Sequence, residues 1–166
     1  MDNKLIYEFS SQKTDGDASL NTLLGGKGAN LAEMSKLGIQ VPPGFTITTE
    51  ACNYFSQNKK LPDGLKEEII KYVSNLESLS QKSFGNNEST LLLSVRSGGM
   101  VSMPGMMDSI LNIGLNDDNI QSLAKAFNDE RFALDSYRRL IQMYSNVVLG
   151  VEMDRFEAVI ANKKRM

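Results

Sequence analysis

The spacing of apolar residues along the chain predicts short strands near its start and helices after them. Residues 65–82 carry an apolar side chain at every third or fourth position, which is the period of one helix face. A longer helix is expected over 130–149, with Gly150 as its stop. Short extended segments are expected at residues 4–9, 39–48 and 91–95. Together these elements predict an α+β fold with a small mixed sheet.

The strand candidates all precede residue 96, whereas helices dominate after residue 115. We therefore expect an α/β subdomain over 1–114, holding two glycine-rich loops, followed by a helical subdomain over 115–166. Asn116 is expected to cap the first helix of the second part, and Thr49 to cap a short helix in the first. Leu31, Met34 and Leu37 stand three apart, so they are expected to form the apolar face of a helix after the first glycine loop.

Composition narrows the class of protein. The chain has 166 residues, of which 41% are hydrophobic and 23% charged, as in globular domains. A formal net charge of −2 provides no overall attraction to nucleic acid or to anionic membranes. There is one cysteine, no readable signal peptide and no apolar run of the ~20 residues that span a membrane. These features favour a cytoplasmic protein without disulfides.

The first candidate site is the turn Gly25–Gly28, which contains Lys27 and precedes a helix. Glycines let backbone amides approach an anion closely, and a helix start adds partial positive charge. The spacing differs from a Walker A motif, and no Ser or Thr follows the lysine. From the residues alone, a tight turn with a solvated lysine remains the alternative to a phosphate site.

The second candidate site is the loop 96–108, which is rich in glycine and methionine. Arg96 stands where the strand over 91–95 is expected to end, and its planar guanidinium suits phosphate. The methionines are equally compatible with core filling or with a lid surface. A loop of this length and composition is unusual for a simple connection, so both readings stay open.

Arg138 and Arg139 form a third candidate in the long helix. The alternative is a solvated pair that bridges to Glu130 or Asp135, since Asp135 and Arg139 are four residues apart in the favourable order. No pair of carboxylates in an extended segment suggests a magnesium site, although ATP chemistry needs such ligands. The chain has no histidine, which excludes any histidine nucleophile, base or metal ligand within it.

In combination, these motifs are far more specific than any one alone. The chain resembles the dikinase group that includes phosphoenolpyruvate synthases, and the run at 102–108 narrows the resemblance to pyruvate, phosphate dikinases. The motifs that carry it, in order and over nearly the whole chain, are GGKGANLAEM at 25–34, VPPGF at 41–45 with Thr48 and Thr49, SVRSG at 94–98, SMPGMMD at 102–108 and SYRRLIQMY at 136–144.

The resemblance implies an ATP-grasp-like nucleotide-binding domain in a family that converts ATP, phosphate and pyruvate to AMP, pyrophosphate and phosphoenolpyruvate. It implies that magnesium is required, that a histidine in a separate domain carries the phosphoryl group, and that pyruvate binds in a further barrel. The family's nucleotide domain is longer than this chain, so the acidic metal ligands are expected outside it. We therefore expect ATP binding without a complete reaction, with the remaining domains supplied in cis or in trans.

The resemblance also assigns site residues. Lys27 and Arg96 match the family's phosphate-binding lysine and arginine, and Arg139 matches, less closely, another nucleotide-site arginine. The loop over the phosphates corresponds to Gly105, Met106, Met107 and Asp108. One departure is local: residues 99–101 are Gly-Met-Val, where relatives often carry a basic residue between two small ones.

Other readings stay open at this point. The chain is a piece of a dikinase, as a split gene product or a remnant, or it is a stand-alone nucleotide-binding or regulatory module without catalysis. A piece of the related phosphoenolpyruvate synthase is a weaker alternative, because the run at 102–108 argues against it. An incomplete domain would expose apolar surface, so self-association is also expected.

Overall fold

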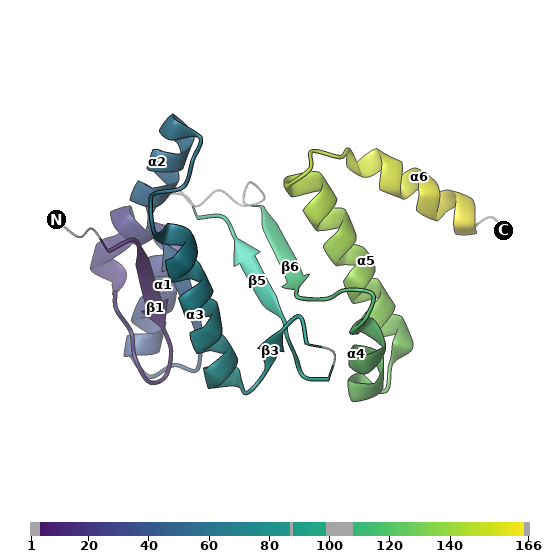
Figure 1. The fold of residues 1–166 in the computed structure, drawn as a ribbon, viewed down its shortest axis with the longest axis horizontal. Helices are drawn as coiled ribbons and strands as arrows, with labels where there is room; N and C mark the ends of the chain where they lie inside the picture. Colours follow the sequence, from purple (N-terminus) through teal and green to yellow (C-terminus); the bar gives the residue numbers. More distant parts are fainter. Residues whose placement is uncertain (1–3, 87, 99–107, 165–166) are drawn as a thin grey trace. The chain divides into compact units, whose positions relative to one another are not determined.

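The computed structural model describes residues 4–86, 88–98 and 108–164. They fall into two compact units (Figure 1), one holding the chain up to Gln81 together with Gly98, the other holding Lys82–Ser97 and the chain from Asp108 on. The first unit contains β1 (Ile6–Phe9), a 3-10 turn (Ala18–Leu20), α1 (Asn21–Lys36), β2 (Gly44–Ile47), α2 (Thr49–Asn58) and α3 (Leu65–Ser80). The second contains β3 (Ser83–Phe84), β4 (Thr90–Leu91), β5 (Leu93–Arg96), β6 (Ser109–Ile113), α4 (Ile120–Phe127), α5 (Glu130–Val147) and α6 (Met153–Lys164).

The α+β class is confirmed, but the strands do not form one mixed sheet. They make three two-stranded sheets, β1–β2 and β5–β6 antiparallel and β3–β4 parallel. The segment 91–95, expected to be one buried strand, is divided between β4 and β5. The pairing of β5 with β6 is irregular between Leu93 and Val95, and Val95 is exposed. The expected boundary near Gly114 falls inside the second unit, because the β5–β6 hairpin before it shares a core with the helices after it.

In the first unit, helices cover both faces of the β1–β2 sheet. Strand residues alternate between the two faces, so Ile6 and Phe45 share one face and Thr46 lies on the other. Ile6 and Phe45 pack with Leu65 at the start of α3. Thr46 meets α1 at Gly28, where an added Cβ would lie 2.7 Å from the Thr46 Cγ2 methyl. Gly28 thus allows α1 to approach the sheet closely.

This close approach explains why the expected apolar face of α1 is wrong. Met34 is 38% exposed and Leu37 68% exposed, while the buried positions hold mostly small residues. The buried residues of α1 are Leu24, Gly25, Gly28, Ala29, Ala32 and Ser35. A helix that lies near a sheet buries its smallest side chains, which periodicity of large apolar residues cannot reveal.

The cap of α2 lies one residue before the expected position. The Thr48 side chain accepts the Ala51 N–H at 3.3 Å and is fully buried, whereas Thr49 is the first helical residue. The second unit shows a similar shift. Asn116 closes a turn by accepting the N–H groups of Asp118 and Asn119, and α4 begins only at Ile120.

An ion cluster around the partly buried Asp15 fastens the loop after β1. The Asp15 carboxylate, 9% exposed, lies 2.8 Å from the Lys4 ammonium and 3.4 Å from that of Lys13, and accepts the Glu8 N–H at 3.1 Å. Burial alone would raise the pKa of Asp15. The hydrogen bonds from Lys4 and Glu8, with the two lysine charges, outweigh burial and hold this pKa below its ordinary value.

The cluster leads to a prediction about acid. A carboxyl whose folded pKa is depressed stabilises the fold above its unfolded pKa of about 3.9, and this contribution is lost as pH falls through the folded pKa. We expect Asp15→Asn to lower the free energy of unfolding by about 1–3 kcal/mol at pH 7. Urea unfolding at neutral and acid pH measures both effects, with the variant showing the weaker pH dependence. An equal acid response of the two proteins would contradict the assignment.

The core of the second unit lies between the β5–β6 hairpin and helices α4 and α5. Its buried members are Ile110, Leu115, Ile120, Ala124, Ala133 and Leu140. Asn119 is fully buried in the turn before α4, where its Nδ2 donates to the Gly114 carbonyl at 2.8 Å and its Oδ1 accepts the Asn116 N–H at 2.9 Å. The side chain of Asn119 therefore fixes the turn between sheet and helix.

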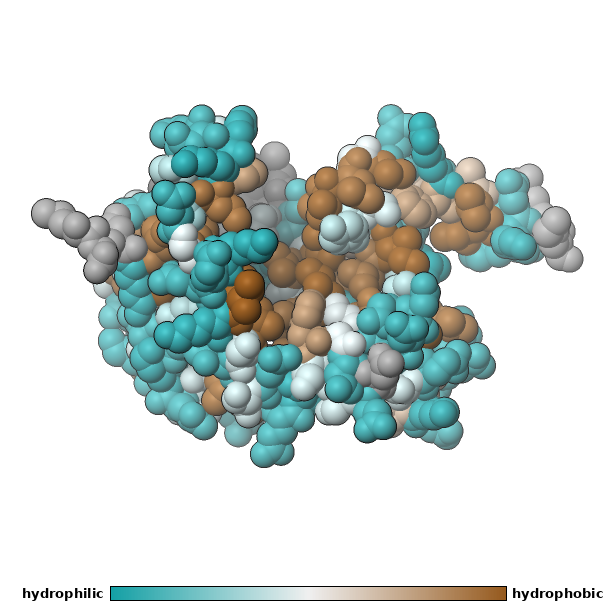
Figure 2. Space-filling model, in the orientation of Figure 1, coloured by the Kyte–Doolittle hydropathy of each residue, from teal (hydrophilic) through white to brown (hydrophobic). Residues whose placement is uncertain are grey.

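Apolar residues gather on the surface where α5 ends and α6 begins (Figure 2). Val148 is 52% exposed and Leu149 64% exposed, and Met153 continues the patch onto α6. This surface agrees with the expectation of exposed apolar area, while self-association itself stays a prediction. No helix in the described ranges is long and apolar enough to cross a membrane.

Candidate functional site

The first glycine loop is a break inside α1. Gly25 has φ 68° and ψ 163°, so the helix stops there and restarts at Gly26. This backbone region is accessible essentially to glycine alone. The first amides of the restarted helix belong to Gly26, Lys27 and Gly28, and a helix start presents such amides with partial positive charge. The expected junction of glycine turn and helix start is thus present, although helical residues also precede it.

Lys27 lies in the first turn after this break and is partly buried. Within the described part of the chain, its ammonium has no ion-pair or hydrogen-bond partner. Lys36, at the other end of the helix, is instead held by Asp17 at 2.9 Å. The charge of Lys27 is therefore available to an anion at the helix start. When no anion is bound, water solvates the ammonium group.

Two other segments lie close to the break. The Thr49 hydroxyl, at the start of α2, donates to the Thr22 carbonyl at 2.8 Å, one turn before Gly25. This contact is not predictable from the sequence, because no local signal links residues 27 positions apart. On the other side lies Gly98, whose ideal Cβ would stand 4.0 Å from the Leu24 carbonyl oxygen. Gly98, at the entry to the second glycine-rich loop, thus lies beside the break that shapes the first.

The second loop connects the two strands of the β5–β6 hairpin. Arg96 is the last residue of β5, pairs with Ser109 in register, and is exposed. Ser97 closes the base of the loop, because its N–H and its hydroxyl both donate to the Asp108 carbonyl at 3.0 Å. Arg96 and Asp108 therefore stand at the two ends of one loop. The other predicted residues of this loop, Gly105, Met106 and Met107, lie outside the described residues.

Arg96, like Lys27, forms no ion pair with any described residue. The two cations belong to different units, so the structure describes their surroundings separately. Each is a cation without a counter-ion among the described residues, next to glycine-rich backbone. A cation in this setting suits a phosphate oxygen, to which arginine donates through a planar fork of N–H groups.

Arg139 is placed differently, and the alternative reading from the sequence is confirmed in part. Its Nε donates to the Asp135 carboxylate at 2.7 Å, and its side chain is 63% exposed. Hydrogen bonds from Arg138 and Arg139 hold the pKa of Asp135 below its ordinary value. The helix thus carries a surface triad of one carboxylate and two arginines.

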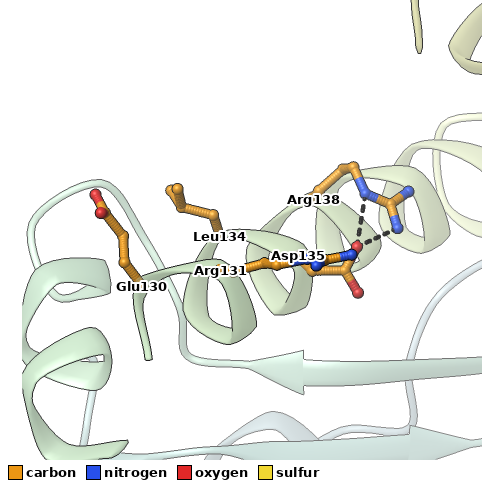
Figure 3. Close-up of a pocket in the computed structure, with 5 residues that line it drawn as sticks. All are labelled: Glu130, Arg131, Leu134, Asp135 and Arg138. Atoms are coloured by element: carbon orange, nitrogen blue, oxygen red, sulfur yellow. Dashed lines mark hydrogen bonds and ion pairs between the residues drawn. The ribbon is translucent and has the colours of Figure 1, made fainter. Parts of the chain in front are cut away.

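A shallow depression lies beside this triad (Figure 3). Its lining residues, Glu130, Arg131, Leu134, Asp135 and Arg138, all come from α5. Figure 3 shows the guanidinium of Arg138 turned back onto the Asp135 carboxylate. A ligand site normally gathers polar groups from several elements, so this surface is a weak candidate.

In the ranges that the structure describes, no group of three or more Asp, Glu, Cys or His side chains lies close enough to hold an ion.

Comparison with known proteins connects these features. Residues 21–85 match the family model described as the AMP/ATP-binding domain of pyruvate phosphate dikinase. That match includes the break at Gly25, Lys27 and the close contact of Gly28 with the sheet. The first glycine loop therefore lies within the region that matches this family model.

The similarity to whole proteins extends further. The chain is 52% identical over 164 residues to the pyruvate, phosphate dikinase of Rickettsia prowazekii (strain Madrid E), 51% over 158 residues to that of Clostridium symbiosum and 51% over 160 residues to that of Entamoeba histolytica. These matches cover 95–98% of this chain but only 18–19% of each relative. The resemblance expected from the motifs is confirmed: the chain is similar over nearly its whole length to one part of the pyruvate, phosphate dikinases, and it contains a match to their AMP/ATP-binding domain.

Proposed function

We propose that this chain binds the phosphates of ATP as part of a pyruvate, phosphate dikinase, which converts ATP, phosphate and pyruvate to AMP, pyrophosphate and phosphoenolpyruvate. The observation that carries the proposal is the glycine-only backbone at Gly25, which starts a new helix at Gly26–Lys27–Gly28 inside the matched nucleotide-binding region. A broken helix costs stability, so a break of this kind is expected where its amides and its lysine serve a ligand.

In this proposal, Lys27 and Arg96 bind phosphate oxygens of one nucleotide, and Arg139 binds the same nucleotide. The loop Gly105–Asp108 lies over the phosphates. Support comes from the lack of protein counter-ions for Lys27 and Arg96 among the described residues, and from Gly98, which lies beside the Leu24 carbonyl at the break. The proposal includes an ATP-grasp-like fold for the complete nucleotide domain and a cytoplasmic location.

Other steps of the reaction are assigned to parts of the relatives that this chain does not match. The chain contains no histidine, so the phosphoryl-carrying histidine of the family has no counterpart in it. The described residues do not fit a magnesium site, since no acidic cluster is present among them. The chain's own contribution is to hold and orient the phosphates, with the remaining dikinase domains as partners in cis or in trans.

The test is a titration of the isotopically labelled chain, followed by NMR of its backbone amides. ATP at up to about 10 mM is expected to shift the amide signals of Gly26, Lys27 and Gly28, because the expected affinity is weak. Adenosine is the matched control, since it has the same base and ribose without phosphate and should leave these signals in place. Unchanged signals with ATP would reject the proposed site.

A further inference from the structure

Two adjacent arginines of α5 share one carboxylate. Oδ1 of Asp135 accepts Nε of Arg138 at 3.0 Å and its Nη2 at 2.5 Å, while Oδ2 accepts Nε of Arg139 at 2.7 Å. Each oxygen of Asp135 therefore serves a different guanidinium. With both oxygens engaged, the carboxylate has little freedom to rotate, and it fixes the direction of both arginine side chains.

The two arginines differ in what remains available to a ligand. Arg138 uses Nε and Nη2 on Asp135, and its Nη1 donates to the side-chain oxygen of Gln142, a residue that is 8% exposed. Arg139 uses only Nε. Among the described residues, the two terminal nitrogens of Arg139 have no partner. All three nitrogens of the Arg138 guanidinium thus bond to side chains of its own helix. Arg139 instead presents an oriented pair of N–H₂ groups to solvent.

Stability is a weak reason for this arrangement. Exposed ion pairs on a helix contribute little to stability, and all three side chains are 42–63% exposed. Holding a long side chain in one geometry before binding is more consequential, because a free arginine loses conformational entropy when it is fixed on binding. A carboxylate that grips Nε and leaves the terminal nitrogens open orients the guanidinium in this way.

We infer that Asp135 is a positioning residue for nucleotide binding, which holds Arg139 through Nε so that the terminal nitrogens of Arg139 bind an ATP phosphate. This inference rests on the proposed function, because it requires that the chain binds ATP. Asp135 does not touch the nucleotide and acts only through Arg139. Arg138 completes the clamp by holding the other oxygen of the same carboxylate.

The sign of the effect separates this role from simple electrostatics. Asp135 is negative, so removing its charge should strengthen the binding of anionic ATP if the residue only competes with phosphate for Arg139. Positioning has the opposite consequence, because a released guanidinium has to be ordered again on binding. Asp135→Asn keeps the size of the side chain and removes the charge, so it tests the sign directly.

The experiment measures the dissociation constant of ATP by NMR titration for the wild-type chain and four variants. We expect Arg139→Gln to weaken binding about tenfold and Asp135→Asn about three- to tenfold. Asp135→Glu should recover part of the loss, because it restores the carboxylate. Arg131→Gln is the matched control: it removes the same charge from an exposed position of the same helix, outside the contacts of Asp135, and should change binding less than about twofold. Circular dichroism of each variant checks that α5 remains helical.

The possible outcomes are distinct. Wild-type affinity or tighter binding in Asp135→Asn, with Arg139→Gln weakened, overturns the positioning role and leaves the proposed function intact. Equal losses in Arg131→Gln and Arg139→Gln also overturn it, because they would show a general charge effect. If the wild-type chain does not bind ATP, the proposed function fails and the positioning role fails with it.

Discussion

Replacing Lys27 or Arg96 by methionine is expected to weaken ATP binding by at least tenfold in each case. Each variant removes one charge-assisted hydrogen bond to phosphate, worth roughly 1.5–3 kcal/mol, while keeping most of the side-chain stem. Neither cation is paired with a described residue, so no protein carboxylate is left without its partner. Titration with ATP under constant low salt, where charge effects are least screened, measures the change.

The control for this pair is Lys66→Met. Lys66 is exposed on α3, and its replacement changes the net charge of the chain by the same amount. We expect its ATP affinity to stay within about twofold of the wild type. The net charge of the chain is close to zero, so one surface charge away from the site attracts ATP only weakly. Equal losses in all three variants would show that ATP responds to overall charge, and the assignment of Lys27 and Arg96 would then fail.

Gly114→Ala is expected to be the most damaging single change to stability. Gly114 has φ 117°, and an added Cβ would lie 2.5 Å from the Leu91 carbonyl oxygen and 3.4 Å from the Phe84 ring. The first contact is with backbone, which cannot move aside as a flexible side chain can. We expect a loss of about 3 kcal/mol or more from strain and overpacking together, or a fall of about 10 °C in Tm.

Gly150→Ala provides a comparison at a glycine of the same unit. Gly150 also has positive φ, at 68°, but an added Cβ would meet no atom within 4 Å. Gly150→Ala should therefore lower the free energy of unfolding by only about 1 kcal/mol, from the strain of alanine at positive φ. Thermal unfolding of the two variants side by side separates backbone strain from the clash at Leu91. Similar Tm values for both would mean that the backbone around Gly114 relaxes freely.

Periodicity identified the long helices well, because a one-sided apolar stripe is recorded in the sequence. α3 and α5 were predicted to within about two residues at each end, which is the usual uncertainty of helix boundaries. β6 was missed because Ile110, Leu111 and Ile113 lack strict alternation, and the strand becomes clear only when Arg96 pairs with Ser109. The α1 face was wrong because the partner of Gly28 is Thr46, which lies 18 positions away and leaves no local periodic signal.

The candidate site was predictable where it depends on residues that are close together in the sequence. The glycine turn with Lys27 and the loop after Arg96 are local features, so their sequence motifs suffice to find them. The pairing of Arg139 with Asp135 follows from their spacing in a helix, and the structure confirms it. The orientation of Arg139 does not follow from spacing, because it depends on which guanidinium nitrogen meets the carboxylate. Similarly, Thr49 and Gly98 could be placed at the α1 break only by the fold.

A crystal structure of this chain with bound ATP would examine most directly whether two separate cations serve one anion. Our account predicts the Lys27 ammonium and the Arg96 guanidinium within about 3 Å of phosphate oxygens of the same nucleotide. A nucleotide bound elsewhere, or one that reaches only one of these two side chains, would contradict it.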